Sequence, residues 1–175
     1  EGARKLAAQH HLGSRVEFEQ INQDTFTLTQ KFDLIFSINT LSDCKNKDVL
    51  FTQLSQALRT SGTLTFMDWF HKSPNYSEAT EAFFKFSDEH FYLNTPQEYL
   101  QQLENYKLSY VNFKDTTKNM LQECEALIKS LKTTHESEIV ATFGAEYYEW
   151  WLEYFSLLYA ALQSGDLLKG HISGV

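Results

Sequence analysis

The stretch "KFDLIFSINTLSDC", residues 31–44, decides how this chain folds. A largely apolar run from Phe32 to Phe36 stops abruptly at small polar residues, of which Ser37 is the first. Such a run is typical of a strand that is buried on both faces of a sheet. Open α/β sheets bind their ligands at the carboxyl ends of their strands. The stretch therefore predicts a strand that delivers a polar cluster to a ligand crevice.

The segments that follow predict a crossover between two parallel strands. Residues 45–62 have the apolar stripe of an amphipathic helix, which we expect Gly62 to close. "TLTFMDWF", residues 63–70, is a second buried strand, and it too leads to polar groups, at Asp68 and His71. A strand, a helix and a strand with tight connections form a βαβ unit, so the two strands should be parallel neighbours.

Hydrophobic periodicity predicts the remaining elements. Residues 1–13 are the end of a helix, residues 15–21 alternate like a short strand, and residues 22–30 are a polar connection. After Pro74 we expect helices at 73–91 and 94–106, a strand at 107–117, helices at 117–135 and 146–163, and a final strand at 166–175. The last two strands should pair antiparallel at one edge, with the final strand beside 63–69.

Composition narrows the class of protein. The 175 residues suit one domain, and 42% hydrophobic and 22% charged residues are ordinary for a soluble one. A formal net charge of -8 disfavours nucleic acid or an anionic membrane surface as the partner. Cys44 and Cys124 lie far apart and form neither a disulfide framework nor a metal-binding spacing. We therefore expect no metal and a reducing, cytoplasmic location.

Aromatic side chains reach 15% of the chain and crowd its second half. Most of them should be helical core, but some could wall a pocket for an apolar or cationic ligand. We predict that rings of the helices after Pro74 cover the carboxyl ends of the strands and line a pocket, namely Phe83, Phe84, Phe91, Tyr92, Trp150 and Trp151.

The order of these segments resembles the class I S-adenosylmethionine-dependent methyltransferases. "VEFEQINQDTF" is similar to the family's third strand, "FDLI" to its fourth, "LRTSG" to the turn after the next helix, and "TLTFMDW" to its fifth strand. The later segments, with "YLNTPQEYLQQLENYKLSYVNFKDTT" and "GDLLKGHISGV", resemble small-molecule N-methyltransferases of the phosphoethanolamine and sarcosine/dimethylglycine kind. The resemblance implies a Rossmann-like α/β sheet with a helical insert that forms a lid over the acceptor.

The same resemblance implies an incomplete domain. These 175 residues contain neither the family's first strand with its Gly-rich loop nor the second strand with its ribose-binding carboxylate. We therefore interpret the chain as the C-terminal part of one methyltransferase domain. Its parts would be a cofactor-side core at 1–72, a helical insert with an edge strand at 73–163, and the last strand at 164–175. The chain alone should be inactive, and its full-length parent should be the enzyme.

The implied cofactor is S-adenosylmethionine, and four residues match its family contacts. Asn22 and Gln23 follow the third strand, where an acceptor for the adenine amino group is expected; the Asn22 carbonyl can serve, or Asn22 can simply form a turn. Ser37 and Ile38 follow the fourth strand, where the family touches adenine and the carboxypropyl arm. Ile38 replaces a basic residue of the phosphoethanolamine enzymes.

The acceptor side keeps fewer family identities. Asn39 and Asp43 match positions that carry a catalytic acidic residue and a histidine in the phosphoethanolamine enzymes. Asp43 could orient an ammonium or accept a proton, or it could cap the helix that starts near Asn46. His71 could be a general base or an ordinary surface histidine. The residues predicted to contact the acceptor are Asn39, Asp68, Trp69 and Tyr92.

The predicted reaction is direct methyl transfer to a small molecule, with an amine as the favoured acceptor. Glu89 stands where a phosphate-binding arginine would be expected, which argues against a phosphorylated acceptor. Two alternatives stay open. The chain could be a non-catalytic methyltransferase-like remnant that acts as a binding or interaction module. It could also be a nicotinamide dehydrogenase of the same sheet type, which suits the final strand less well. The sequence does not indicate an oligomeric state.

Overall fold

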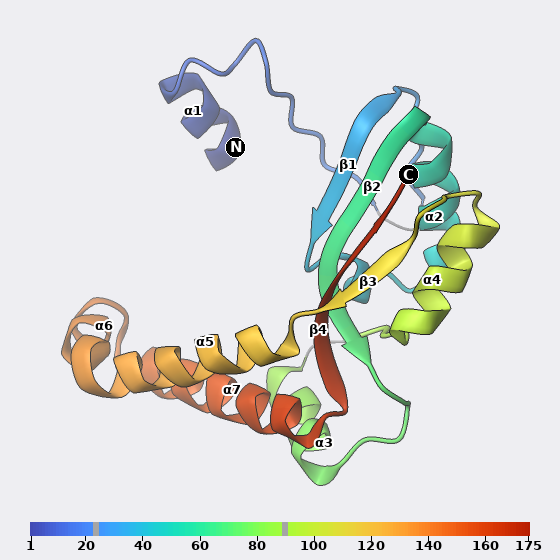
Figure 1. Ribbon diagram of the computed structural model, residues 1–175. Helices are drawn as coiled ribbons and strands as arrows, with labels where there is room; N and C mark the ends of the chain where they lie inside the picture. Colours follow the sequence, from blue (N-terminus) through green and yellow to red (C-terminus); the bar gives the residue numbers. More distant parts are fainter. Residues whose placement is uncertain (23–24, 89–90) are drawn as a thin grey trace.

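A four-stranded sheet lies at the centre of the molecule (Figure 1). The computed structural model describes residues 1–22, 25–88 and 91–175. The strand order is β1 (Phe32–Ile38), β2 (Leu58–His71), β4 (Leu167–Gly174) and β3 (Asn112–Asp115). β1 and β2 are parallel, and β4 pairs antiparallel with both β2 and β3. Both the predicted parallel pair and the predicted antiparallel pair at the edge are confirmed.

Helix α2 (Lys47–Ala57) makes the crossover from β1 to β2. The Asn46 side chain caps it by accepting a hydrogen bond from the Val49 N–H at 3.2 Å. The expectation that Gly62 closes this helix is wrong, because the chain becomes extended at Leu58 and Gly62 already belongs to β2. Packing is tight at Gly62: a Cβ would lie 3.1 Å from the carbonyl oxygen of Phe32, so the neighbouring strand would have to shift by a few tenths of an ångström.

The segment before β1 departs from its prediction. Helix α1 (Gly2–Gln9) forms as expected, but residues 16–22 are irregular and form no strand. A strand needs a neighbouring backbone with which to exchange hydrogen bonds. Among the residues that the structure describes, no strand is paired with this segment. Figure 1 shows it as an extended path that leads from α1 towards the sheet.

β1 is not buried on both faces, contrary to its apolar sequence. Leu34, Phe36 and Ile38 are 55%, 68% and 55% exposed, whereas Ile35 packs against the core. The alternation arises because successive side chains of a strand point to opposite faces. α2 covers one face of β1, and the described part of the chain leaves the other face open.

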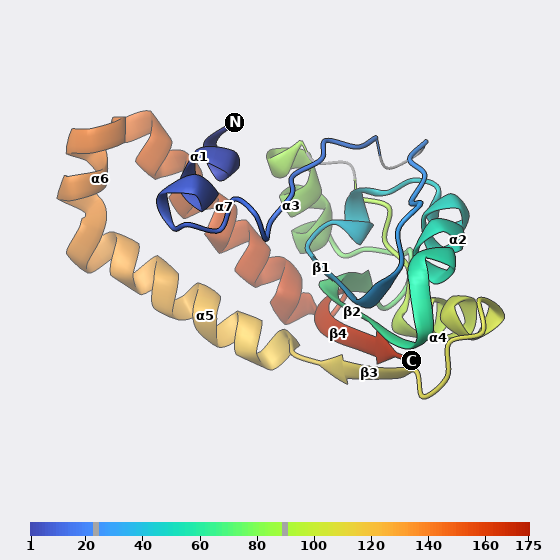
Figure 2. The ribbon, with the colours of Figure 1, turned by 90° about the horizontal axis from the view of Figure 1, so that it is seen from above.

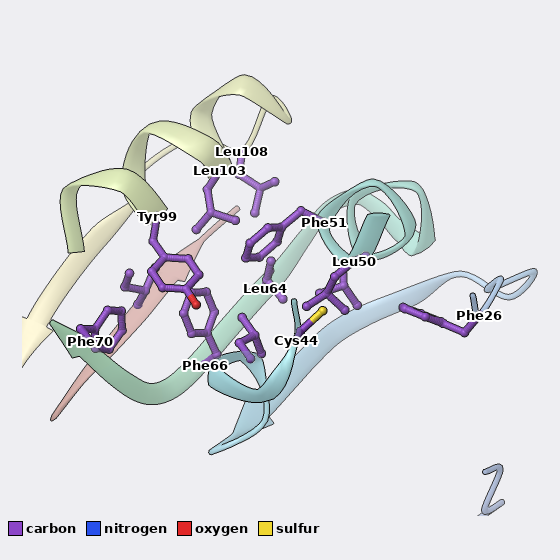
Figure 3. Close-up of a cluster of buried hydrophobic side chains, with 13 residues drawn as sticks. Phe26, Cys44, Leu50, Phe51, Leu64, Phe66, Phe70, Tyr99, Leu103 and Leu108 are labelled. Atoms are coloured by element: carbon purple, nitrogen blue, oxygen red, sulfur yellow. The ribbon is translucent and has the colours of Figure 1, made fainter. Parts of the chain in front are cut away.

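The main core lies on the covered face of the sheet (Figure 3). Helix α4 (Pro96–Asn105) places Tyr99 against the rings of Phe66 and Phe70, each with its centroid 5.4 Å from that of Tyr99. The helix expected at 94–106 is observed as α4, and it begins with a capping box: the Thr95 side chain accepts from the Glu98 N–H, and the Glu98 carboxylate accepts from the Thr95 N–H. This capping box fixes where the helix enters the core.

A second core joins three helices near the carboxyl end of β2 (Figures 1 and 2). These are α3 (Glu78–Ser87), α5 (Thr117–Ser130) and α7 (Ala145–Ser164). α5 continues through a π-helical turn (Leu131–His135) into α6 (Glu136–Phe143), after which α7 returns to the sheet. Phe83 is only 2% exposed, whereas Trp150 is 40% exposed. The helices thus stand at the predicted end of the sheet, with part of their rings as core; that the rings line a pocket stays a prediction.

Candidate cofactor cleft and acceptor side

A cleft of about 940 Å³ opens beside β1, towards its carboxyl end. It lies between β1, α2 and the segment that precedes β1. Its wall is largely apolar, with polar groups at the carboxyl end of the strand. The lining residues are Gln20, Ile21, Asn22, Phe26, Leu28, Ile35, Phe36, Ser37, Thr40, Leu41, Leu50 and Leu54.

The cleft brings together two of the four predicted cofactor residues, Asn22 and Ser37. Ile38 is the neighbour of Ser37 on the strand, so its side chain points to the opposite face, where it is 55% exposed. Ile38 is not among the residues that line the cleft. Gln23 lies outside the described residues, and so does Glu89.

Sequence reasoning missed most of the cleft's apolar wall. Phe26 and Leu28 line the cleft, although the segment around them reads as a polar connection. Their spacing of two, between threonines in "TFTLT", was a signal for a segment with one apolar face. Thr40 and Leu41 also line the cleft, and they belong to the polar cluster that follows β1.

The Asp68 side chain holds the loop after β1 in place. Its side chain is completely buried, and its Oδ2 accepts from the Thr40 N–H at 3.1 Å and the Leu41 N–H at 2.7 Å. Its Oδ1 accepts from the Trp69 N–H at 2.8 Å. Both carboxylate oxygens are therefore bonded to main-chain groups of the protein. The acceptor contact predicted for Asp68 stays untested, but the observed bonds make it a loop anchor.

Lys47, which sequence reasoning did not single out, supports the same loop. It is 6% exposed, and its Nζ donates to the carbonyl oxygens of Leu41 and Cys44, both at 2.9 Å, and of Tyr92 at 2.6 Å. The signal was its position three residues before Leu50, on the apolar stripe of the helix.

A second buried lysine joins two predicted acceptor residues. Lys169 of β4 is 5% exposed, and its Nζ lies 4.2 Å from the centroid of the Trp69 ring. The same Nζ donates to Oδ1 of Asn39, a residue with a φ of 53°. Burial lowers the pKa of Lys169 to about 8, although the charge of Asp68 counteracts the shift. Asn39 and Trp69 thus meet at an ammonium group at the carboxyl ends of β1 and β2.

The two predicted catalytic residues differ in accessibility. Asp43 ends the 3₁₀ turn η1 (Leu41–Asp43) and is exposed, and partial burial and the nearby Asp68 raise its pKa against the effect of Lys47. It does not cap α2, because Asn46 does. His71 is no surface residue: it is 8% exposed, and its Nδ1 lies 2.9 Å from the Tyr76 hydroxyl. Their catalytic roles stay predictions.

Tyr92, the remaining predicted acceptor contact, is 38% exposed.

Within 1–22, 25–88 and 91–175, no group of three or more His, Cys, Asp or Glu side chains could hold a metal ion. No helix in those ranges is both long and apolar enough to cross a membrane.

Comparison with known proteins places the chain in a family. Residues 1–124 match the family model of a methyltransferase domain. The chain belongs to this methyltransferase family. The family resemblance predicted from the sequence is thereby confirmed, and S-adenosylmethionine is the cofactor that these domains use. A comparison with curated protein sequences finds no match.

Solved structures show the same fold at low identity. A putative sarcosine dimethylglycine methyltransferase from Galdieria sulphuraria has a TM-score of 0.80 and 12% identity over 98% of this chain and 62% of that one. Phosphoethanolamine N-methyltransferase 2 from Haemonchus contortus, with phosphomonomethylethanolamine and S-adenosylhomocysteine, has a TM-score of 0.77 and 15% identity over 86% and 34%. The chain thus spans about a third to three fifths of these relatives. The predicted Rossmann-like class I fold is confirmed.

Proposed function

We propose that this chain supplies the adenine side of the cofactor site and the acceptor lid of an S-adenosylmethionine-dependent methyltransferase that acts on a small-molecule amine. The observation that carries the proposal is the cleft beside β1. It combines an apolar wall, which suits an adenine ring, with the polar side chains of Asn22 and Ser37. The carboxyl end of a strand next to a crossover is also where this class of sheet binds its ligands.

The protein needs to contribute little covalent chemistry to this reaction. The sulfonium of the cofactor is already an activated electrophile, so the site has to align the acceptor and exclude water. An ammonium acceptor must first lose a proton. Asp43 is the more accessible of the two predicted catalytic groups, and its raised pKa suits a proton acceptor better than an ordinary carboxylate.

The chain by itself should bind the cofactor weakly. The cleft provides contacts from one side only, since the 175 residues contain no Gly-rich loop or ribose-binding carboxylate of the family type. Each missing hydrogen bond to a charged group is worth about 1.5–3 kcal/mol, so losing two or three weakens binding roughly a thousandfold or more. A longer protein that adds these elements should bind tightly and transfer the methyl group.

An NMR titration of the chain with S-adenosylhomocysteine tests the cofactor half of the proposal. We expect a dissociation constant well above the micromolar range. The chemical-shift changes should be concentrated at the amides of Ser37, Thr40 and Leu41. Asn22→Ala should weaken binding by about threefold to tenfold, the value of one hydrogen bond. Asn112→Ala, on the exposed part of β3, is the matched control. Micromolar binding by the chain would contradict the one-sided site, and no shift at these amides would contradict the cleft.

The acceptor half of the proposal is tested on a longer protein that adds the Gly-rich loop and the ribose-binding carboxylate. With labelled S-adenosylmethionine, we expect methyl transfer to small amines and not to alcohols of the same size. A longer protein that binds the cofactor but methylates neither class would instead support the non-catalytic binding module.

A further inference from the structure

We propose that Asp68 and Lys47 are a pair of positioning residues that clamp the 40–44 turn, the turn from Thr40 to Cys44 that follows β1. This inference rests on the proposed function, because that turn supplies Thr40 and Leu41 to the wall of the cofactor cleft. Neither residue would touch the cofactor. Their role would be to hold in place the main chain that contacts the cofactor.

The two side chains act on opposite ends of the peptide groups in the turn. Asp68 accepts from the N–H groups of Thr40 and Leu41, while Lys47 donates to the carbonyl oxygens of Leu41 and Cys44. An anion thus satisfies the N–H groups at the start of the turn, and a cation satisfies carbonyl groups at Leu41 and at its end. Charge-assisted bonds of this kind are stronger than neutral ones.

Burial makes the clamp selective for one backbone conformation. Asp68 is fully buried and Lys47 is 6% exposed, so water cannot readily replace the main-chain partners of either charge. Moving the turn would leave a buried carboxylate or ammonium without its partners, which is costly. Burial lowers the pKa of Lys47, while Cys44, Asp68 and Asp43 counteract the shift.

The clamp also ties the turn to the acceptor side. Lys47 donates to the Tyr92 carbonyl oxygen at 2.6 Å, and the Tyr92 N–H donates to the Ser42 carbonyl oxygen at 2.7 Å. The chain just before α4 is therefore fixed to the 40–44 turn by one direct bond and to Lys47 by a second. Because Tyr92 is a predicted acceptor contact, the cofactor wall and the acceptor segment should move as one unit.

Amide hydrogen exchange of the chain without cofactor tests the clamp directly. Asp68→Asn should raise the amide exchange rates of Thr40 and Leu41 by about tenfold or more. Lys47→Met should raise the amide exchange rates of Cys44 and Tyr92 by a similar factor. Lys45→Met, two positions away on the exposed surface, removes the same charge and should change none of these amides. Unchanged exchange in the first two variants would overturn the clamp. An equal rise at the β4 amides would also overturn it, since that reports general destabilisation.

A second measurement separates this inference from the proposed function. In the S-adenosylhomocysteine titration, Lys47→Met should weaken binding at least threefold, and Lys45→Met should leave it unchanged. The conservative variant Lys47→Arg should restore part of the affinity, because a cation returns to the carbonyl groups. Equal affinity of Lys47→Met and the unmodified chain would overturn the positioning role. If the unmodified chain shows no binding, the cofactor cleft fails, while the exchange experiment still decides the clamp.

Discussion

At the scale of single residues, the buried lysines and the buried aspartate are the most informative side chains. A lysine at 5% exposure, such as Lys169, is rare unless its charge is stabilised. Here the Trp69 ring and the Asn39 side chain provide that stabilisation. The arrangement gathers charge at the carboxyl ends of β1 and β2, where the proposed reaction would take place.

Lys169 should make stability depend on pH in the alkaline range. Its folded pKa of about 8 lies below its ordinary value of 10.5, so between these values the unfolded chain binds more protons. The free energy of unfolding contributed by this residue should therefore rise with pH from about 8 to about 10.5, by at most about 1.4 kcal/mol per pH unit.

Urea unfolding of the unmodified chain and of Lys169→Met, compared at several pH values, measures this contribution. The difference between the two should shift in favour of the unmodified chain as pH rises through the window. Lys114→Met, an exposed lysine of β3, should show no such trend. Parallel pH profiles for Lys169→Met and the unmodified chain would show that Lys169 titrates normally.

At the scale of elements, a remote carboxylate starts helix α3. Ser77, the residue before α3, donates its N–H to Oδ2 of Asp166 at 2.7 Å, and the Thr80 hydroxyl donates to the same oxygen at 3.1 Å. Asp166 lies between the end of α7 and the start of β4. A helix cap that comes from another element joins α3 to α7, and so it helps to hold the helices at the carboxyl end of β2.

Asp166→Ala should destabilise the fold by about 1 kcal/mol, the usual cost of a lost helix cap. Hydrogen bonds from the side chain and backbone of Ser77, and from Thr80, lower the pKa of Asp166. A group with a lowered folded pKa stabilises above its unfolded value and loses this effect as pH falls through the folded value. The cost measured by thermal unfolding should thus be full at pH 7 and shrink as the pH falls below 3.8, the ordinary pKa of the carboxyl group, towards its lowered folded pKa. Asp33→Ala, which removes only an exposed ion pair with Arg59, should cost far less; equal costs would argue against the cap.

At the scale of the whole molecule, the residues that the structure describes leave one apolar side of the sheet uncovered. β1 is an edge strand, and its outward side chains include Phe36 at 68% exposure. Open strand edges and contiguous apolar surface favour association between chains. We therefore expect the isolated chain to self-associate through β1 as its concentration increases.

Phe36→Lys should shift the chain towards the monomer in sedimentation velocity, because it places a charge in the middle of the apolar surface. Tyr110→Lys is the matched control, since Tyr110 is an exposed ring, at 86%, that precedes β3 on the opposite edge. The control should sediment like the unmodified chain. If both variants dissociate equally, net charge rather than β1 governs association.

The sequence by itself determined the class and the order of the elements. Local periodicity and the rules of strand connection predicted the βαβ unit, the antiparallel pair of β3 and β4, the helix expected at 94–106 and the long helix near 146–163. These signals lie within a few residues of the element that they specify. The polar cluster after Phe36 likewise located the edge of the sheet that holds the cleft.

Tertiary structure alone decided which faces are covered and which groups meet. Residues 16–22 alternate like a strand, yet a strand requires a neighbour that no local pattern supplies. β1 is largely apolar, but the exposure of its side chains depends on what packs against each face. Lys47 reaches a carbonyl 45 positions away and Lys169 a side chain 130 positions away. Such contacts depend on the assembled sheet, because only there do the carboxyl ends of separate strands, and the charges that hold them, come together.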